Sequence, residues 1–189
     1  MNIHINKAVK IIHEGGIIAY PTEGTFCFGC DPFNNTAVLR LIKIKQRNIE
    51  KGLILIASDW SQVASLVNIN LNTCNNIREN INPVTKNPIT WIFPATKKVP
   101  PCIASKSNSI IIHVTSHPVV KLLCQKYGAP IVGTSANIAK QLPAKTFKQT
   151  YSNFSNLIDF IIPGNAGNSK KTIEFRDIQT SELIHTKNP

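Results

Sequence analysis

The feature that most constrains the fold is an alternation of short apolar runs with longer segments in which apolar residues recur every three or four positions. Runs of about four to eight apolar residues are typical of buried strands, and the longer spacing is typical of helices with one apolar face. Strands that alternate with helices predict an α/β domain with a mixed sheet. The expected strands are 17–20, 53–57, 90–95, 109–115, 130–132, 157–162, 172–177 and 182–186, and the expected helices are 5–14, 36–46, 58–67, 118–127 and 146–156.

Local residues indicate where several of these elements begin and what separates them. Asn34 or Asn35 is expected to cap the second helix and Ser58 the third, because short polar side chains satisfy the free N–H groups of a first helical turn. The segment 21–32 is polar and contains glycine, so it is expected to be a loop. The segment 68–88 is rich in Asn and weakly patterned, with room for one short helix.

Chain length and cysteine usage bound the organisation of the protein. A chain of 189 residues with 42% hydrophobic residues can bury one core, so residues 1–189 are expected to form a single domain. No stretch approaches the roughly 18 unbroken apolar residues of a membrane span, and the N-terminus lacks the pattern of a signal peptide. Five cysteines at irregular spacing disfavour a disulfide framework. These features predict a cytoplasmic protein with reduced thiols and no membrane partner.

The chain is strongly basic, with 21 Lys and Arg against 10 Asp and Glu and a formal net charge of +11. The electrostatic field of this charge attracts polyanions such as nucleotides or RNA, but it does not indicate which of them binds. The sequence is also rich in Ile, Asn and Lys in general, and a bias of composition toward lysine explains the charge equally well.

Four segments carry motifs that matter together: YPTEGTFCFGCD at 20–31, KQRNIEKGLILIA at 45–57, SIIIHVTSHPV at 109–119 and GTSAN at 133–137. In this order and at these separations they resemble the TsaC/YrdC family. The family has a PTE loop after its first strand, a Lys-x-Arg and a further Lys before a core strand, a strand leading into a His-Pro helix start, and a Ser-x-Asn turn. The later segment EFRDIQTSELI is similar to the closing strand pair of that family. The resemblance implies a single YrdC-like domain, in which a twisted mixed sheet flanked by helices forms a concave basic cleft.

Two of these motifs suit the binding of phosphate. Arg makes planar bidentate contacts to phosphate and Lys supplies a compact charge, so Lys45 and Arg47 can act as a clamp, although basic residues at a helix end often only face water. Ser135 and Asn137 follow a strand, where ligands of α/β sheets usually bind, although both are also ordinary turn residues. The resemblance implies that these four residues converge on ATP as the catalytic set, with Lys51 and Ser109 as further nucleotide contacts.

The resemblance assigns Thr22 and His113 to the threonine and carbamate end of the pocket. Thr22 lies in the PTE loop directly after a buried strand, where the alternative is a Pro-nucleated turn with Thr22 and Glu23 in water. His113 stands where the family usually has an Arg that pairs with the threonine carboxylate. A histidine offers fewer donors and is only partly charged near neutral pH. The alternative for His113 is a half-buried side chain whose hydrogen bonds are satisfied within the fold.

Two pairs of residues have spacing typical of metal ligands, Cys27-x-x-Cys30 and His113-x-x-x-His117. The pairs lie far apart in the chain, and Cys30 fits the family loop without a metal, so no structural metal is expected. A thioredoxin-like use of the two cysteines is also disfavoured, because an Asp-Pro pair follows them where a helix should begin.

The resemblance implies a nucleotidyltransferase that makes threonylcarbamoyl-adenylate from L-threonine, bicarbonate and ATP. The threonine carbamate would attack the α-phosphorus of ATP and expel pyrophosphate. Because the nucleophile is already an anion, the protein needs to supply positioning and charge stabilisation. The implied cofactor is Mg²⁺ bound to the nucleotide, and the implied partner is tRNA or a tRNA-modifying complex.

Two other classes of function compete with this interpretation. A non-catalytic protein that binds double-stranded RNA or tRNA, as in ribosome assembly, would show basic residues interleaved with exposed aromatic residues. Aromatic residues are only 7% of the chain, and several fall in expected strands. A carbamoyl transferase for another acceptor is the second rival, because related domains occur in hydrogenase-maturation proteins. No adjoining domain of that kind is present in the sequence, which disfavours it.

Overall fold

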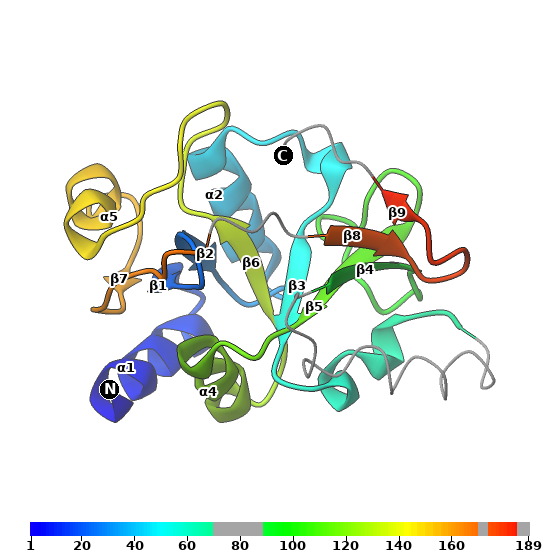
Figure 1. Cartoon of the computed structure of the whole chain (residues 1–189), viewed down its shortest axis with the longest axis horizontal. Helices are drawn as coiled ribbons and strands as arrows, with labels where there is room; N and C mark the ends of the chain where they lie inside the picture. The colour runs from blue at the N-terminus through cyan, green and yellow to red at the C-terminus, as the bar shows by residue number, and fades with distance from the viewer. Residues whose placement is uncertain (70–88, 170–173, 185–189) are drawn as a thin grey trace.

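One mixed sheet organises the computed structural model, which describes residues 1–69, 89–169 and 174–184 (Figure 1). Its strands are β1 Ile18–Pro21, β2 Phe26–Gly29, β3 Ile54–Ala57, β4 Ile89–Pro94, β5 Ser109–Val114, β6 Ile131–Ser135, β7 Phe160–Ile161, β8 Glu174–Asp177 and β9 Leu183–Ile184. The strand order is β7-β1-β2-β6-β3-β5-β4-β8-β9. The β1–β7, β3–β5 and β4–β8 pairs are parallel and the other pairs are antiparallel. The predicted α/β domain with a mixed sheet is confirmed.

Helices lie on both faces of this sheet. Those of the described residues are α1 Asn2–His13, α2 Asn35–Lys45, α4 Pro118–Tyr127 and α5 Phe147–Phe154, with the 3₁₀ turns η1 Ile49–Lys51, η2 Trp60–Gln62 and η3 Ala64–Leu66. Side chains of α1 and α4 share an apolar cluster with Ile18 and Tyr20 of β1. Side chains of α2 share a second cluster with Ala19 of the same strand. Because successive strand residues point to opposite faces, α1 and α4 cover one face and α2 covers the other.

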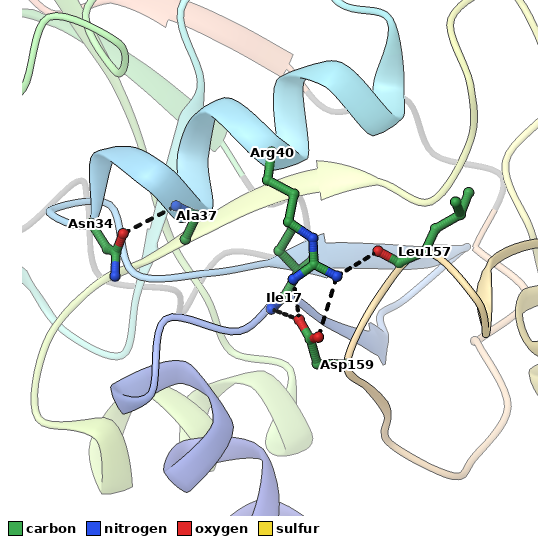
Figure 2. Close-up of polar contacts among 6 residues, drawn as sticks. All are labelled: Ile17, Asn34, Ala37, Arg40, Leu157 and Asp159. Atoms are coloured by element: carbon green, nitrogen blue, oxygen red, sulfur yellow. Dashed lines mark hydrogen bonds and ion pairs between the residues drawn. The ribbon is translucent and has the colours of Figure 1, made fainter.

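The position of α2 is fixed at its start and along its length, as Figure 2 shows. The side chain of Asn34 accepts a hydrogen bond from the backbone N–H of Ala37 at 3.0 Å, which confirms the predicted cap. Arg40 donates through Nη1 to Asp159 Oδ2 at 2.7 Å, and the same carboxylate oxygen accepts from the backbone N–H of Ile17. This carboxylate joins α2 to the start of β1 and to the chain before β7.

The helix predicted at 58–67 is wrong. The chain makes two 3₁₀ turns there, and the cap is Asp59, whose Oδ1 accepts from a backbone N–H of η2 at 3.0 Å. Ser58 instead donates its hydroxyl to Asp59 Oδ2. Val67 then pairs with Ala95 in a β-bridge, so the chain returns to the sheet before a longer helix can form.

The loop predicted at 21–32 contains β2. This strand pairs with β1, where Tyr20 lies opposite Cys27, and with β6, where Cys27 lies opposite Ser135. Phe26 and Phe28 are fully buried on the α2 side. Pairing with β6, more than a hundred residues along the chain, makes this short polar segment a strand.

The other predicted strands and helices are confirmed with shifts of a few residues at their ends. The strand at 157–162 shortens to β7, and the strand at 130–132 extends through Ser135 as β6. Residues 70–88, which include most of the weakly patterned segment, lie outside the described residues. Within the described part of the chain, no helix has the length and apolar character that crossing a membrane requires.

Candidate functional site

The side chain of Lys45, the last residue of α2, reaches the end of β6. Its Nζ donates to the carbonyl oxygen of Ser135, to the carbonyl oxygen of Asn137 at 3.0 Å and to Asn137 Oδ1 at 2.9 Å. The residue is only 4% exposed. A lysine ammonium has three donor hydrogens, so these three bonds use its full capacity. The charge of Lys45 therefore holds together the turn that follows β6.

The same turn is fixed by its own side chains. Ser135 donates its hydroxyl to Asn137 Oδ1 at 2.6 Å, and Asn137 Nδ2 donates to the carbonyl oxygen of Gln141 at 2.7 Å. The backbone N–H of Ala139 donates to the carbonyl oxygen of Lys45 at 2.8 Å. Residues that are 90 positions apart in the chain thus form one hydrogen-bonded group.

Arg47 lies beside this group because α2 ends with a left-handed residue, Gln46, at φ 50°. The Nε and Nη2 atoms of Arg47 donate to the carbonyl oxygen of Gly52 at 3.2 and 3.1 Å. Gly52 has φ 65°, and a Cβ there would lie 3.0 Å from the backbone nitrogen of Ser105. Only glycine fits this close approach without strain. We call Lys45, Arg47, Ser135 and Asn137 the Lys45 cluster.

The electrostatics of the Lys45 cluster favour a bound anion. Burial lowers the pKa of Lys45 to about 8, with a further lowering from the charge of Arg47 and a small opposing effect of Cys27. Burial also lowers the pKa of Arg47. Both side chains remain cations at neutral pH, so two like charges lie close together in a partly buried place. A phosphate beside them would relieve this repulsion.

Sequence analysis predicted two further nucleotide contacts, Ser109 and Lys51. Of these, Ser109 is connected to Gly52 through Ser105. Ser109 opens β5, and its hydroxyl lies 2.7 Å from that of Ser105 and 3.2 Å from that of Ser107. Gly52 packs against Ser105, which places this serine group near the start of β3. Lys51, at the end of η1, is exposed. The structure therefore brings Ser109 close to the Lys45 cluster through Gly52, while Lys51 faces solvent.

The helices α1 and α4 cover only part of one face of the sheet. Ser135 lies on the remaining part of that face. Cys27 is paired with Ser135, and Ile54 is paired with Ile111, which in turn is paired with Ile92. Strand alternation puts all five side chains on this face. All five are half-buried, whereas the residues of the same face beneath α1 and α4 are buried. The partly exposed positions of β2, β6, β3, β5 and β4 thus form the floor of the candidate site.

Thr22 and Glu23 form the turn that joins β1 to β2 beside this floor. The Oγ1 and backbone N–H of Thr22 both donate to the carbonyl oxygen of Thr25, at 2.7 and 3.0 Å. The backbone N–H groups of Gly167 and Ser169 donate to the carbonyl oxygens of Thr22 and Glu23, both at 2.9 Å. The turn is therefore held on both sides, and the hydroxyl of Thr22 is bonded within it.

His113 lies on the same sheet face, in β5, and is 8% exposed. Its Nδ1 is 3.2 Å from the hydroxyl of Thr90 on β4. Burial lowers the pKa of His113, and the carboxylate of Glu23 and the backbone of Ile89 oppose that effect. His113 is therefore neutral at pH 7, and its ring can offer a hydrogen bond but no full charge.

Tyr20 lies on the same sheet face, and His117, which sequence analysis weighed only as a metal ligand, precedes α4. The Tyr20 hydroxyl and His117 Nδ1 are buried side-chain atoms without a hydrogen-bond partner among the described residues. Burial is the main cause of the shifted pKa values of Tyr20, His113 and His117, and the charge of Glu23 also acts on each of the three. We call Tyr20, Glu23, His113 and His117 the Glu23 cluster. Strand alternation could have indicated Tyr20, which lies on the same face as Cys27, and the His-Pro start of α4 marks His117 in the sequence.

The two cysteines of the CxxC motif do not form a pair. Cys27 faces the candidate site, whereas Cys30 belongs to the apolar cluster beneath α2, and both are free thiols. Burial raises the pKa of Cys27 to about 11 and raises that of Cys30 as well. Among the described residues, no group of three or more His, Cys, Asp or Glu side chains is placed to hold a metal ion.

Comparison with known proteins places this site in a family context. The model of the Sua5/YciO/YrdC family, described as telomere recombination, matches residues 10–176. That match includes every residue of the Lys45 cluster and of the Glu23 cluster.

Two bacterial proteins with the same name align over nearly the whole chain. The threonylcarbamoyl-AMP synthase of Coxiella burnetii (strain RSA 493) is 41% identical, and the alignment covers 95% of each chain. The protein of the same name from Nitrosococcus oceani is 38% identical, with 97% of each chain covered. The crystal structure of P. abyssi Sua5 complexed with L-threonine is 22% identical and has a TM-score of 0.83. It is matched over 95% of this chain but only 52% of its own length, and the likeness shows a shared fold.

Proposed function

The chain belongs to the Sua5/YciO/YrdC family, and from that premise we propose that it is a threonylcarbamoyl-AMP synthase. The enzyme makes L-threonylcarbamoyladenylate from L-threonine, bicarbonate and ATP and releases pyrophosphate. Relatives with this name align over at least 95% of this chain and of their own, at 41% and 38% identity. A structural relative was crystallised with L-threonine, which supports the same amino-acid substrate here.

The observation that carries the proposal is the assembly of the Lys45 cluster. The buried ammonium of Lys45 bonds to the amide of Asn137, which also accepts from the Ser135 hydroxyl, and the charge of Arg47 acts on Lys45. A triphosphate concentrates several negative charges in a small volume, and cations beside fixed donors are the groups that bind it. In this proposal Arg47, Ser135 and Asn137 hold the ATP phosphates, and Lys45, whose three donors are already bonded, acts on them through its charge. Lys51 and Ser109 make further contacts to the nucleotide.

The reaction needs charge stabilisation more than acid–base chemistry. The carbamate of threonine attacks the α-phosphorus of ATP, a new P–O bond forms, and the bond to pyrophosphate breaks. Negative charge accumulates on the phosphate oxygens and the leaving group, where Lys45 and Arg47 would offset it. Mg²⁺ enters with ATP as part of the substrate, because phosphate oxygens are its preferred ligands.

The amino-acid end of the site is the Glu23 cluster together with Thr22. Thr22 and His113 would line the threonine and carbamate pocket. Because His113 is neutral at pH 7, it would bind the threonine carboxylate by a hydrogen bond instead of an ion pair. A hydrogen bond from a neutral donor is weaker than one from a cation, so the KM for threonine should be higher than an Arg at this position would give.

The product would be transferred to tRNA, directly or through a tRNA-modifying partner complex. An acyl adenylate reacts readily with water, so transfer without long diffusion preserves it. ATP, threonine and tRNA are found together in the cytoplasm, where thiols such as Cys27 stay reduced. We therefore place the reaction there.

The proposal is tested by pyrophosphate release from ATP with threonine and bicarbonate omitted in turn. We expect release to need both, and the product to be an adenylate that contains threonine. Release that is indifferent to both omissions would remove the synthase assignment.

One observation favours the rival function, RNA binding without turnover. On α5, Tyr151 is 58% exposed and stacks against Phe147, which the exposed Lys145 and Lys148 flank in the sequence. Exposed aromatic rings between lysines are typical of surfaces that bind unpaired bases. RNA binding that Tyr151→Ala abolishes, in a protein without pyrophosphate release, would favour this function over the synthase.

A further inference from the structure

The turn that joins β1 to β2 is bound along its backbone by a segment from a distant part of the chain. The backbone N–H groups of Gly167 and Ser169 donate to the carbonyl oxygens of Thr22 and Glu23, both at 2.9 Å. These two bonds bring the two backbones into direct contact. We call residues 164–169 the strap and residues 22–25 the PTE turn.

The strap is also fixed near its start. Asn165 pairs with Thr146 in an antiparallel β-bridge, and Thr146 is the cap of α5. The side chain of Thr146 accepts from the backbone N–H of Gln149 at 3.1 Å, and the side chain of Gln149 accepts from the backbone N–H of Thr146. This reciprocal capping box holds Thr146 in place. The strap therefore connects the PTE turn to the N-terminus of α5.

Two glycines allow the strap and the PTE turn to come this close. A Cβ on Gly167 would lie 2.4 Å from the carbonyl oxygen of Glu23, and a Cβ on Gly24 would lie 2.8 Å from the carbonyl oxygen of Ser169. Real Cβ atoms essentially never lie within 3.0 Å of such an atom. Both obstacles are backbone atoms, which cannot rotate away as the end of a side chain can. A side chain at either position would therefore push the strap away from the turn.

These two glycines are needed for space and not for backbone freedom. Neither Gly24 nor Gly167 is among the described glycines with positive φ. Gly128 is the reverse case, because it has φ 81° at the end of α4 and no heavy atom within 4 Å of the place of a Cβ. Gly167→Ala therefore tests the contact between strap and turn, whereas Gly128→Ala tests backbone strain alone.

The strap holds the middle of the PTE turn, which the turn's own bonds leave free. Thr22 donates through Oγ1 and through its backbone N–H to the carbonyl oxygen of Thr25, so these bonds join the two ends of the turn. The carbonyl oxygens of Thr22 and Glu23 point outward and accept from the strap. A turn held only at its ends can tilt relative to the sheet, and the strap prevents this.

We propose that Gly167 and Gly24 are positioning residues of the reaction, because they let the strap hold the PTE turn in the place that threonine binding requires. This inference rests on the proposed function, which assigns Thr22 to the threonine end of the pocket. A displaced turn would weaken threonine binding and misplace the carbamate, and small misplacements of reacting groups cost much of the rate. The Lys45 cluster, built on α2 and β6, would stay in place.

The test measures pyrophosphate release by the full-length protein while threonine and ATP are varied in turn. We expect Gly167→Ala to raise the KM for threonine and to lower kcat/KM for threonine about 30-fold or more, with the KM for ATP within about twofold of wild type. Gly24→Ala, which has more clearance, should have a smaller effect of the same kind. The two effects should not multiply in the double variant, because both act on one contact. Asn168→Ala, exposed on the strap, is the matched control and should change neither KM.

Two further readouts separate positioning from a general loss of stability. The backbone N–H of Ser169 should exchange its hydrogen at least about tenfold faster in Gly167→Ala than in the wild type, because its bond to the turn is weakened. Gly128→Ala should lower the melting temperature and keep the KM for threonine, because its strain lies at the end of α4.

Three results would overturn this inference and leave the proposed function standing. They are a wild-type KM for threonine in Gly167→Ala, wild-type hydrogen exchange at Ser169 in that variant, and an equal rise of the KM for threonine in Gly128→Ala. Pyrophosphate release by the wild type that needs no threonine would overturn both.

Discussion

The Lys45 cluster and the Glu23 cluster lie on one face of the same sheet, but they differ in how their polar groups are satisfied. In the Lys45 cluster the ammonium makes three hydrogen bonds, and the hydroxyl of Ser135 bonds to the amide of Asn137. In the Glu23 cluster two buried atoms have no partner among the described residues. The fold satisfies the polar groups of the first region and leaves these two atoms of the second unpaired.

One site can therefore serve folding and binding at once. A cluster whose bonds are made within the protein contributes to stability before any ligand arrives, so its substitution should cost stability and activity together. A cluster with unpaired atoms lowers stability in the ligand-free state, so its substitution should cost activity alone. The following predictions test this separation.

The largest effect is expected for Lys45→Met, which keeps the aliphatic stem and removes the ammonium. Three acceptors lose their donor, so we expect the free energy of unfolding to fall by about 2 kcal/mol and kcat/KM to fall at least about 100-fold. Urea unfolding and pyrophosphate release measure the two quantities. Lys97→Met, on an exposed loop, should change neither. Wild-type stability in Lys45→Met would show that the hydrogen bonds of the Lys45 cluster do not stabilise the fold, so the two clusters would not differ in this respect.

The second largest effect is expected for Arg47→Ala. It removes a cation from the phosphate end and two hydrogen bonds to Gly52, so kcat/KM should fall about 30-fold, or about 2 kcal/mol, with a smaller loss of stability. The charge of Arg47 also lowers the pKa of Lys45, so that pKa should rise above about 8 in the variant. A titration of the lysine Nζ by NMR measures this. Activity no lower than that of Lys97→Ala would assign Arg47 to the surface.

Acid should destabilise the Glu23 cluster. The pKa values of His113 and His117 are lowered in the folded protein, chiefly by burial. As pH falls through the ordinary histidine pKa of about 6.5, the histidines of the unfolded chain become protonated while those of the folded protein stay neutral. The free energy of unfolding therefore falls. Urea unfolding at about pH 7 and pH 5 should show this fall, and His113→Gln should reduce it. If the exposed control His13→Gln reduces the fall as much, the effect does not come from this cluster.

The smallest effect is expected for Ser135→Ala. It removes one donor to Asn137 Oδ1, which keeps its bond from Lys45, so stability should fall by only about 1 kcal/mol and kcat/KM a few-fold. The same two assays measure these changes, and Ser152→Ala, exposed on α5, is the control. A loss as large as that of Lys45→Met would show that the hydroxyl, and not the ammonium, holds the turn together.

Local sequence was enough for most of the fold. Asn34 before an apolar periodic segment, and the His-Pro pair before another, mark the starts of α2 and α4, because capping depends on neighbours in the chain. The helix predicted at 58–67 failed because Asp59 caps a single short turn and Val67 pairs with a distant residue. β2 was missed because its pairing with β6 is equally distant.

For the site, the residue types were predictable from the chain alone: the cations of Lys45 and Arg47, the Ser-x-Asn turn, and the PTE turn with Thr22. Folding determines that internal hydrogen bonds use all three donors of Lys45 and that His113 is neutral. It also leaves the Tyr20 hydroxyl without a hydrogen-bond partner among the described residues. The physical reason is that side-chain chemistry belongs to each residue alone. Burial, protonation and hydrogen-bond satisfaction depend on residues that only folding brings together.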